Sequence, residues 1–438
     1  MNAVIMGGGL AGISLAYFLQ DREDITHITI LEKDDEIGGL CRSLRADGYI
    51  YDIGPHILFS KDKEMLNLML DVLGDNKNEL RRSNQIIYKG RWVQYPFEND
   101  LSKLPEKDLK YCIESFLHNP YEHYEATNML QFFLKTFGEG ITNCYLRPYN
   151  EKIWKYDPSF MNTSMVDRIP KPGEDDIMRS ANGETVDGYL HQLYFRYPAE
   201  GGIESVIKGF ARRLDPSKCC IHTKSEVVSV KREGGKYQIL SANGEEYSAD
   251  LAISTIPVNE LAGIYHGVKS DIKGLAGKLR YNSIIIAFIK TREDLCGDNF
   301  AFIIPDKEII FHRISKMDFL GSAYKRDGAT YMVEITYREK DQVDSMSEED
   351  LFIAIKAGVR AIGFAKSESD IEIINLTRHK YAYVIYDLEH TPTMEGIRKY
   401  FKGEGLVLHG RFGNFEYWNM DRVVRESKEL SEKVMPAM

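Results

Sequence analysis

A glycine-rich turn near the N-terminus has the spacing needed to hold a dinucleotide. It reads G-x-G-x-x-G and lies between an apolar strand expected at residues 3–6 and a helical run at 13–19. The first glycine of such a turn permits a tight bend, the second lets the backbone approach a pyrophosphate, and the third lets helix and strand pack closely. The unpaired N–H groups at the start of the helix attract the anion. The residues of this predicted site are Gly7, Gly9, Leu10, Ala11 and Gly12.

An acidic residue follows at the end of the next expected strand. This strand covers residues 28–31 and ends at Glu32, which lies 20 positions after Gly12. A carboxylate at this distance can accept hydrogen bonds from a ribose 2′-OH, and an acid rather than a base favours an unphosphorylated ribose. A plain βαβ turn with coincidental glycines is the alternative. The order of strand, helix, second strand and acid favours dinucleotide binding.

A second glycine turn indicates which dinucleotide binds. The pattern E-x-x-x-x-x-G-G-L-x-R begins at Glu32, and it resembles FAD enzymes of the amine oxidase kind more than NAD dehydrogenases. The resemblance therefore implies FAD. The cofactor contacts expected in this stretch are Glu32, Lys33, Gly39, Leu40 and Arg42.

Later segments resemble UDP-galactopyranose mutase, a flavoenzyme family related to protoporphyrinogen oxidases and amine oxidases. The first of them reads D-x-G-P-H-x-x-F-S and runs from Asp52 to Ser60. The others lie at residues 88–99, 147–154, 195–202, 311–313 and 410–421, with Arg168 placed 14 residues after Trp154. Each motif is moderately specific. Their collinear order, from Met1 to about Val434, makes the resemblance much stronger than any one of them.

The resemblance implies roles for particular residues. His56, Arg168 and Arg313 are the expected catalytic residues. The two arginines would bind a diphosphate, whose oxygens match a guanidinium fork, and His56 would lie against the isoalloxazine. Without this context, a surface salt bridge and a buried loop histidine would be the better interpretations. The expected substrate contacts are Tyr95, Phe97, Asn150, Trp154, Tyr383 and Tyr417, with core packing as the alternative for the aromatic residues. Further expected flavin contacts are Gly54, Pro55, His56, Val228, Gly410, Arg411, Tyr417, Asn419 and Met420.

The implied activity is a flavin-dependent nucleotide-sugar mutase that interconverts pyranose and furanose forms, as in cell-surface glycan biosynthesis. The reaction is redox-neutral, with reduced FAD as the nucleophile at the anomeric carbon, so no side-chain base is required. NAD(P)H is a candidate external reductant, and the substrate is a nucleotide-diphosphate sugar. The sugar, the base and a homo-oligomeric state stay open. The alternatives are a FAD-dependent oxidoreductase of the amine oxidase or protoporphyrinogen oxidase type and a non-catalytic flavoprotein.

Two positions depart from the family pattern. Glu98 stands where many members carry Gln beside the nucleotide, so the recognised base or sugar could differ. Ile303, ten positions before Arg313, stands where eukaryotic members place a diphosphate-binding tyrosine. One phosphate hydrogen bond would then be missing.

Composition sets limits on the class of protein. The chain has 438 residues, 43% hydrophobic and 28% charged, and its 56 Lys+Arg against 66 Asp+Glu give a net charge of −10. This is typical of a globular chain of about two or three domains. The acidic balance argues against nucleic acid as the main partner, and no run approaches the ~20 apolar residues of a membrane span. The six cysteines show no CxxC and no zinc spacing, which favours reduced thiols in a cytoplasm. The sequence also shows no gathered set of metal ligands.

The elements that must position these residues suggest an α/β fold with a Rossmann-type FAD-binding domain. This domain is expected to use residues 1–60, 200–256 and 400–438, with a mainly helical substrate domain at 61–199 and an antiparallel sheet over the flavin at 257–399. Apolar spacing near 3.6 predicts helices at 65–73, 109–117, 126–137 and 187–195, and further helices are expected at 201–214 and from 421. Strands are expected at 226–231 and 237–240 (a hairpin), 249–255, 283–289, 300–304, 309–314, 331–336 and 406–409.

Overall fold

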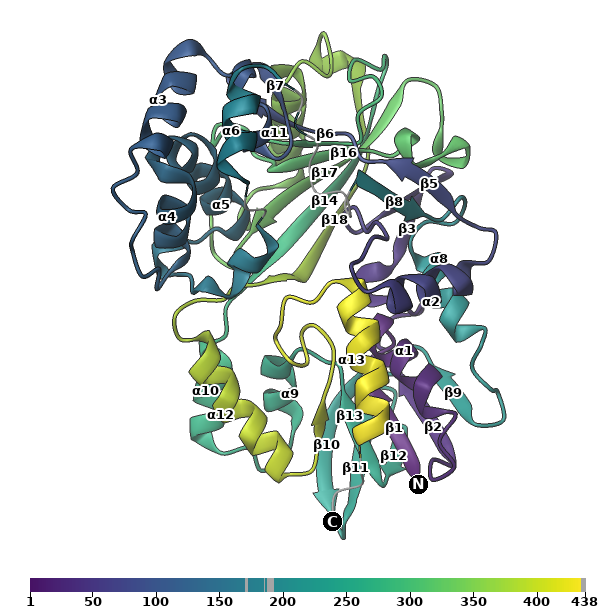
Figure 1. Ribbon diagram of the computed structural model, residues 1–438. Coiled ribbons are helices and arrows are strands. Elements are labelled where there is room, and N and C mark those ends of the chain that lie inside the picture. The colour runs from purple at the N-terminus through teal and green to yellow at the C-terminus, as the bar shows by residue number, and fades with distance from the viewer. Residues whose placement is uncertain (170–171, 185, 187–192, 435–438) are drawn as a thin grey trace.

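The molecule has two halves, one above the other in Figure 1. The computed structural model describes residues 1–169, 172–184, 186 and 193–434, without the side chains of Asp167 and Arg168. One half is built on a parallel sheet, and the other on a larger mixed sheet with helices beside it. The predicted α/β class is therefore confirmed. In the described part of the chain, no helix is both long and apolar enough to cross a bilayer.

The lower half in Figure 1 contains a five-stranded sheet whose neighbouring strands all run parallel. In spatial order these strands are β19 (Val407–Leu408), β13 (Leu251–Ser254), β1 (Asn2–Met6), β2 (His27–Leu31) and β9 (Cys219–His222). All of β13 and all but the first residue of β1 are buried, which is why both appear as apolar runs in the sequence. The strands predicted at 3–6, 28–31, 249–255 and 406–409 are confirmed.

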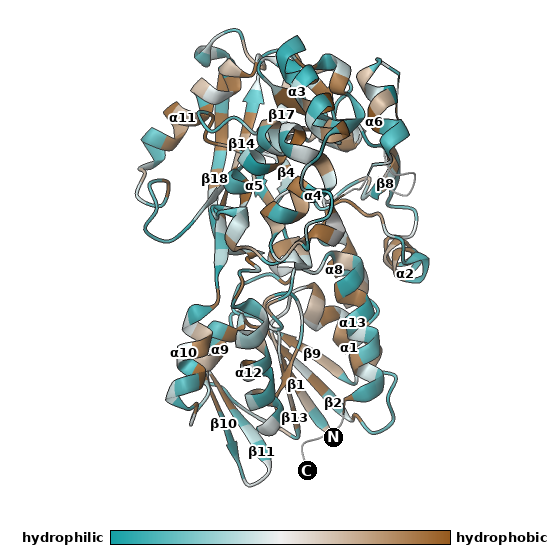
Figure 2. Cartoon of the chain, turned by 60° about the vertical axis from the view of Figure 1, so that its left-hand side comes forward, coloured by the Kyte–Doolittle hydropathy of each residue, from teal (hydrophilic) through white to brown (hydrophobic). Residues whose placement is uncertain are grey.

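Helices cover this sheet. Three of them lie together, with α1 (Leu10–Leu19) packed against both α8 (Glu204–Ala211) and α13 (Met420–Lys433) (Figure 2). The other elements of this half are β10 (Val227–Glu233), β11 (Lys236–Ser241), β12 (Glu246–Ala249), α9 (Val258–Ile264), α10 (Ser270–Lys278) and α12 (His390–Gly403). β10 and β11 form the predicted hairpin, in which Gly234 and Gly235 take the positive φ values of the turn.

The upper half contains a seven-stranded sheet that is antiparallel except where β15 and β6 run parallel. In spatial order the strands are β18 (Ile371–Val384), β14 (Tyr281–Thr291), β17 (Ala329–Tyr337), β16 (Arg313–Lys316), β15 (Ala301–Ile303), β6 (Asn84–Tyr88) and β7 (Arg91–Gln94). One face packs against α11 (Glu348–Ala361) through a separate apolar core. On the other face, Tyr51 of β4 (Tyr49–Asp52) stacks on Phe288, with 4.4 Å between ring centroids.

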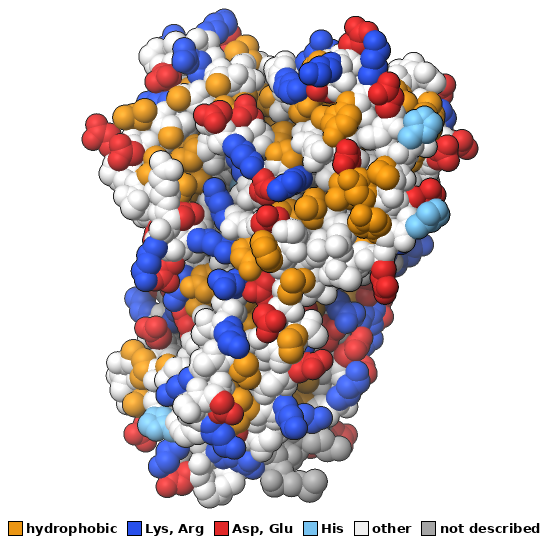
Figure 3. Space-filling view, turned by 90° about the vertical axis from the view of Figure 1, so that its left-hand side faces the viewer, with side chains coloured by type: hydrophobic (Ala, Val, Ile, Leu, Met, Phe, Trp, Pro, Cys, Tyr) orange, Lys and Arg blue, Asp and Glu red, His pale blue; other side chains and the backbone are white. Residues whose placement is uncertain are grey.

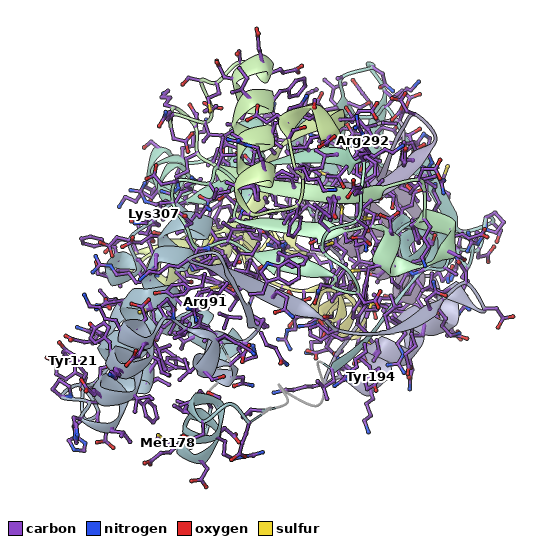
Figure 4. The ribbon with its side chains drawn as sticks, turned by 90° about the horizontal axis from the view of Figure 1, so that it is seen from above. Arg91, Tyr121, Met178, Tyr194, Arg292 and Lys307 are labelled. Atoms are coloured by element: carbon purple, nitrogen blue, oxygen red, sulfur yellow. The ribbon has the colours of Figure 1, made fainter. Side chains whose placement is uncertain are left out.

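A group of helices lies beside the large sheet. They are α3 (Glu106–Leu117), α4 (Met129–Ile141), α5 (Arg147–Trp154) and α6 (Glu174–Ala181). Seen from above, Tyr121 and Met178 mark this group at one side of the molecule, with Arg292 on the far side of the sheet (Figure 4). The remaining strands and α-helices of the described residues are β3 (Ser43–Ala46), α2 (Lys63–Leu73), β5 (Asn78–Arg81) and β8 (Tyr194–Tyr197), of which β5 and β8 lie beside the large sheet.

Most predicted elements are confirmed within a few residues, and one strand prediction is wrong. Of the helix predicted at 187–195, residues 187–192 lie outside the described part, Leu193 is helical, and the last two residues belong to strand β8. The strand predicted at 309–314 begins only at Arg313. β18 was not predicted, because its middle residues are polar and partly exposed and therefore lack an apolar run. β6 and β7 join the large sheet although they lie within residues 61–199. The division of the chain into three domains stays a proposal.

Candidate functional site

A cavity of about 1370 Å³ lies where the two halves meet. Its lining begins at the glycine turn after β1 and includes the loop at 53–59, β18 residues 377–383 and the segment at 410–421. Sites for drug-sized ligands usually measure about 300–1,000 Å³. The volume therefore leaves space for a second ligand beside a dinucleotide.

The glycine turn has the geometry that dinucleotide binding requires. Gly7 has a φ of +115°, and a Cβ atom there would lie 2.2 Å from Oγ1 of Thr255. At Gly12, a Cβ atom would lie 2.0 Å from the Gly7 carbonyl oxygen. Gly9 is the N-cap of α1 and has no side chain to occupy the helix start. The turn therefore leaves open backbone at a helix N-terminus, as a pyrophosphate needs.

Glu32 lies at the predicted ribose position. Its side chain is buried, and its two oxygens accept hydrogen bonds from the backbone N–H groups of Gly8 (2.8 Å) and Asp34 (3.0 Å). These bonds fix the carboxylate at the cavity wall. Because each oxygen has two lone pairs, the carboxylate can still accept from a ribose hydroxyl. Arg42, also in the wall, forms an ion pair with Asp34 at 3.0 Å.

Arg313, a partly buried residue of the cavity wall, forms an ion pair with the buried Glu334. The two residues face each other across β16 and β17. The guanidinium donates from Nε to Oε1 at 2.5 Å and from Nη2 to Oε2 at 2.6 Å. Burial alone would lower the pKa of Arg313, but the charge of Glu334 holds this pKa well above its usual value. Among the described residues, the Nη1 group has no hydrogen-bond partner, so it is available for an anion.

His56 is a neutral imidazole in the same wall. Burial, together with the charges of Arg411 and Arg313, lowers its pKa to about 4. Its Nδ1 atom lies 3.2 Å from the carbonyl oxygen of Gly54. A carbonyl can only accept, so Nδ1 carries the proton and Nε2 is left as an acceptor.

Three aromatic side chains form a cluster beside Arg313. The rings of Tyr383 and Tyr417 are nearly parallel with centroids 6.0 Å apart, and Trp154 meets both edge-on at 5.7 and 5.8 Å. The guanidinium of Arg411 lies 4.2 Å from the ring centroid of Tyr417, a cation–π arrangement. Burial raises the pKa of Tyr383, so its hydroxyl stays protonated and can donate.

The structure brings most of the predicted site residues to this one cavity, although what each one binds stays a prediction. Those in its wall are Gly7, Gly9, Leu10, Ala11, Glu32, Lys33, Gly39, Leu40, Arg42, Gly54, Pro55, His56, Arg313, Tyr383, Gly410, Arg411, Tyr417, Asn419 and Met420. Gly12 lies under the turn. Asn419 is the N-cap of α13, so a second helix also starts at the cavity.

Other predicted residues lie elsewhere. Asn150 is bonded to the Leu146 carbonyl and to Trp154 Nε1, and neither Asn150 nor Trp154 reaches the wall. Phe97 is fully buried and Tyr95 lies outside the wall. Val228 is 40% exposed and Val227 takes the wall position, because side chains alternate along a strand. Arg168 ends the short helix η6 (Thr163–Arg168), and its side chain lies outside the described part.

Two buried acids, Glu334 and Glu98, were not predicted as site residues from the sequence. Glu334 is the only charged residue in the fully buried strand β17, and this isolation was the available signal. Glu98, noted only as a departure, is buried, and burial raises its pKa to about 7. It lies next to Phe97, which stacks on Tyr145 with 4.9 Å between centroids.

Comparison with known proteins defines the class. The family model of flavin containing amine oxidoreductases matches residues 10–396, and the chain belongs to this family. Its cofactor is FAD, and the glycine turn and Glu32 fit that group.

Two of the sequence relatives carry the same name, coproporphyrinogen III oxidase. The chain is 19% identical over 293 residues to coproporphyrinogen III oxidase of Bacillus subtilis, covering 60% of this chain and 61% of that one. It is 34% identical over 71 residues to the enzyme of that name in Staphylococcus aureus, covering 16% and 15%. The chain thus spans less than two thirds of the length of either relative.

Among solved structures, the fold is similar to that of reduced UDP-galactopyranose mutase. The TM-score is 0.89 with 23% identity, covering 99% of this chain and 95% of that one. Putrescine oxidase bound to putrescine has a TM-score of 0.67 with 15% identity, covering 99% of both chains. The expected resemblance to a mutase-like flavoenzyme fold is therefore confirmed.

Proposed function

We propose that this flavoenzyme is a nucleotide-sugar mutase that interconverts pyranose and furanose forms without net redox change. The observation that carries the proposal is the position of Arg313, whose guanidinium lies in the wall of the same cavity as the FAD turn, beside two tyrosines. The similarity of fold to UDP-galactopyranose mutase supports it.

Arg313 would bind the diphosphate of the substrate. Its ion pair with Glu334 fixes the direction of the guanidinium, so little side-chain entropy is lost when an anion binds. Tyr383 adds a hydroxyl donor without adding charge. Arg168 is proposed as the second phosphate-binding arginine.

When bound and reduced, FAD supplies the nucleophile for the anomeric carbon of the sugar. His56 has an accepting Nε2 atom in the wall and would hold a polar hydrogen of the flavin or the substrate. The guanidinium and the tyrosine hydroxyl stabilise the departing diphosphate, whose charge grows as the bond to the sugar breaks. NAD(P)H is proposed as the reductant.

An oxidoreductase is the second candidate, favoured by the family and by the names of the sequence relatives. Arg313 would then bind a carboxylate or serve only as the partner of Glu334. The two candidates differ in electron balance, since only the oxidoreductase consumes an acceptor in each turnover.

An anaerobic assay separates the two. The protein is reduced with dithionite and incubated with a panel of nucleotide sugars, and products are separated by chromatography. The proposal expects an isomerised sugar nucleotide with the reduced protein and none with the oxidised protein. Stoichiometric consumption of oxygen or another acceptor, without isomerisation, would contradict it and support the second candidate.

A further inference from the structure

Asp52 begins the sequence motif that carries His56, and no role proposed above uses it. It is the last residue of β4, is fully buried and lies outside the cavity wall. The residues at 53–58, which follow it directly, all line the cavity. Burial raises the pKa of the Asp52 carboxyl to about 6, so at neutral pH it is mainly a carboxylate, which can only accept hydrogen bonds.

Three donors from distant parts of the chain surround this carboxylate. Oδ1 accepts from Oγ of Ser43 at 2.7 Å and from the N–H group of Ile203 at 3.2 Å. Oδ2 accepts from the hydroxyl of Tyr197 at 2.6 Å. Ser43 belongs to β3, Tyr197 is the fully buried last residue of β8, and Ile203 is the N-cap of α8. Asp52 therefore ties the start of the cavity loop to three other elements.

Strand β8 also holds the far end of the cavity loop at 53–58. The backbones of Leu58 and Arg196 exchange two hydrogen bonds, each of 2.8 Å. Arg196 precedes Tyr197 in β8. One strand thus binds the loop at both ends, through the Tyr197 hydroxyl before residue 53 and through the Arg196 backbone at residue 58.

Between these two anchors, the loop contacts groups of the proposed site. Gly54 has a φ of +84°, and a Cβ atom there would lie 3.4 Å from Oε2 of Glu334, the partner of Arg313. The carbonyl oxygen of Gly54 lies 3.2 Å from Nδ1 of His56. A displacement of this turn would therefore move the imidazole relative to the cavity.

We infer that Asp52 and Tyr197 are positioning residues, which hold His56 at the cavity wall through the loop at 53–58. The inference rests on the role proposed above for His56 toward the flavin. Without the Tyr197 hydroxyl, Oδ2 loses a charge-assisted hydrogen bond inside the protein, and the start of the loop loses its link to β8. A contact to a cofactor depends on placement within about 0.5 Å, so a small movement of the loop is enough to change it.

A double-mutant cycle on the FAD-loaded protein tests the inference through the midpoint potential of the flavin. Tyr197→Phe removes the hydroxyl and keeps the buried ring, and retained flavin absorbance shows that the variant folds. Its potential should shift in the same direction as that of His56→Ala. Adding Tyr197→Phe to His56→Ala should cause no further shift. An unchanged potential in either single variant, or the same shift from Tyr197→Phe with and without His56, would overturn the inference.

Tyr237→Phe is the matched control. Tyr237 is also fully buried, and its hydroxyl donates to the Glu404 carbonyl oxygen at 2.7 Å, outside the cavity wall. Its loss should leave the potential unchanged, and an equal shift in this control would show a general effect of removing a buried hydroxyl.

Hydrogen exchange of the peptide containing residues 53–58 gives a second readout, which also applies to the flavin-free protein. Exchange should be faster in Tyr197→Phe than in the parent chain and unchanged in Tyr237→Phe. Unaltered exchange in Tyr197→Phe would show that the loop is held without this bond and would refute the inference. Neither measurement uses a nucleotide sugar, so the result does not depend on whether the mutase assay succeeds.

Discussion

Arg313 enters the cavity with its charge already balanced by Glu334, whose side chain is 1% exposed. A pair of this kind holds the guanidinium rigid, but the carboxylate also cancels its positive charge locally. The local field that an anion meets therefore depends on other groups nearby, of which Arg411 is one. The acidic overall charge of the chain does not oppose binding in such a pocket. On the face shown in Figure 3, Lys and Arg side chains are interspersed with Asp and Glu.

Replacing Arg313 by alanine should weaken UDP binding. We expect a loss of about 2–5 kcal/mol, the usual range for truncating one partner of a buried charged pair, because Glu334 is also left unpaired beside the phosphates. Isothermal titration calorimetry on the FAD-loaded variant measures it. Arg292→Ala, whose side chain is 72% exposed, is the matched control and should bind UDP normally. Unchanged UDP affinity in Arg313→Ala would remove the phosphate role.

His409 should make stability depend on pH in the acid range. Burial lowers its pKa to about 3 in the folded protein, and Nε2 is bonded to Oγ of Ser427 at 2.8 Å. An unfolded histidine has a pKa near 6.5, so below that pH the unfolded chain binds the extra proton. The free energy of unfolding should therefore fall as pH drops from about 6.5 towards 3, by up to about 1.4 kcal/mol per pH unit for this group.

Denaturant titrations at several pH values test this linkage. His409→Asn should be less stable at neutral pH but show a shallower loss on acidification than the parent chain. His118→Asn alters an exposed histidine and should leave the slope unchanged. An identical pH slope in His409→Asn and the parent would contradict the assignment.

At the scale of elements, the site depends on where strands and helices begin. α1 and α13 both start at the cavity, and they are linked by a hydrogen bond of 2.8 Å between Ser14 and Ser427. The N-termini of both helices thus face the cavity, where their dipoles would favour the negative charge of a dinucleotide. β16 and β17 set the Arg313–Glu334 contact through their register.

Gly12→Ala should prevent FAD binding. Its methyl group would lie 2.0 Å from the Gly7 carbonyl oxygen, so helix α1 or the turn must move. We expect purified protein with little or no visible flavin absorbance, because the displaced turn can no longer approach the pyrophosphate. Gly263→Ala in α9 has nothing within 4 Å of the added Cβ atom and should bind flavin as the parent does. Full flavin content in Gly12→Ala would show that the turn can adjust.

At the scale of the whole molecule, the cavity is the place where the two halves and several distant segments meet. Its wall combines residues from the first glycine turn, the large sheet and the last helix. A ligand that fills it therefore contacts both halves at once, and its binding free energy adds to the stability of the folded chain.

Removal of FAD should lower the unfolding temperature. Addition of UDP should raise the unfolding temperature of the FAD-loaded protein but not that of the flavin-free protein. For any ligand at 100 times its dissociation constant, the expected stabilisation is about 2.7 kcal/mol. Differential scanning calorimetry of the loaded and flavin-free protein measures both effects. Equal unfolding temperatures with and without FAD would mean that the cofactor does not join the two halves energetically.

The sequence by itself determined the glycine turn, the acid at the end of β2 and most of the elements of the parallel sheet. These features depend on local requirements: a glycine at a positive φ or at a close contact, an acid at a strand end, and an apolar run along a buried strand. Each is visible within a few consecutive residues.

Only the tertiary structure decided which side chains share the cavity. The pairing of Arg313 with Glu334 depends on the register between two strands, and Val227 rather than Val228 faces inward because of the phase of β10. Asn150 and Trp154 satisfy each other instead of reaching the wall. Register, phase and partner choice are set by contacts between residues far apart in the chain, so no local pattern could fix them.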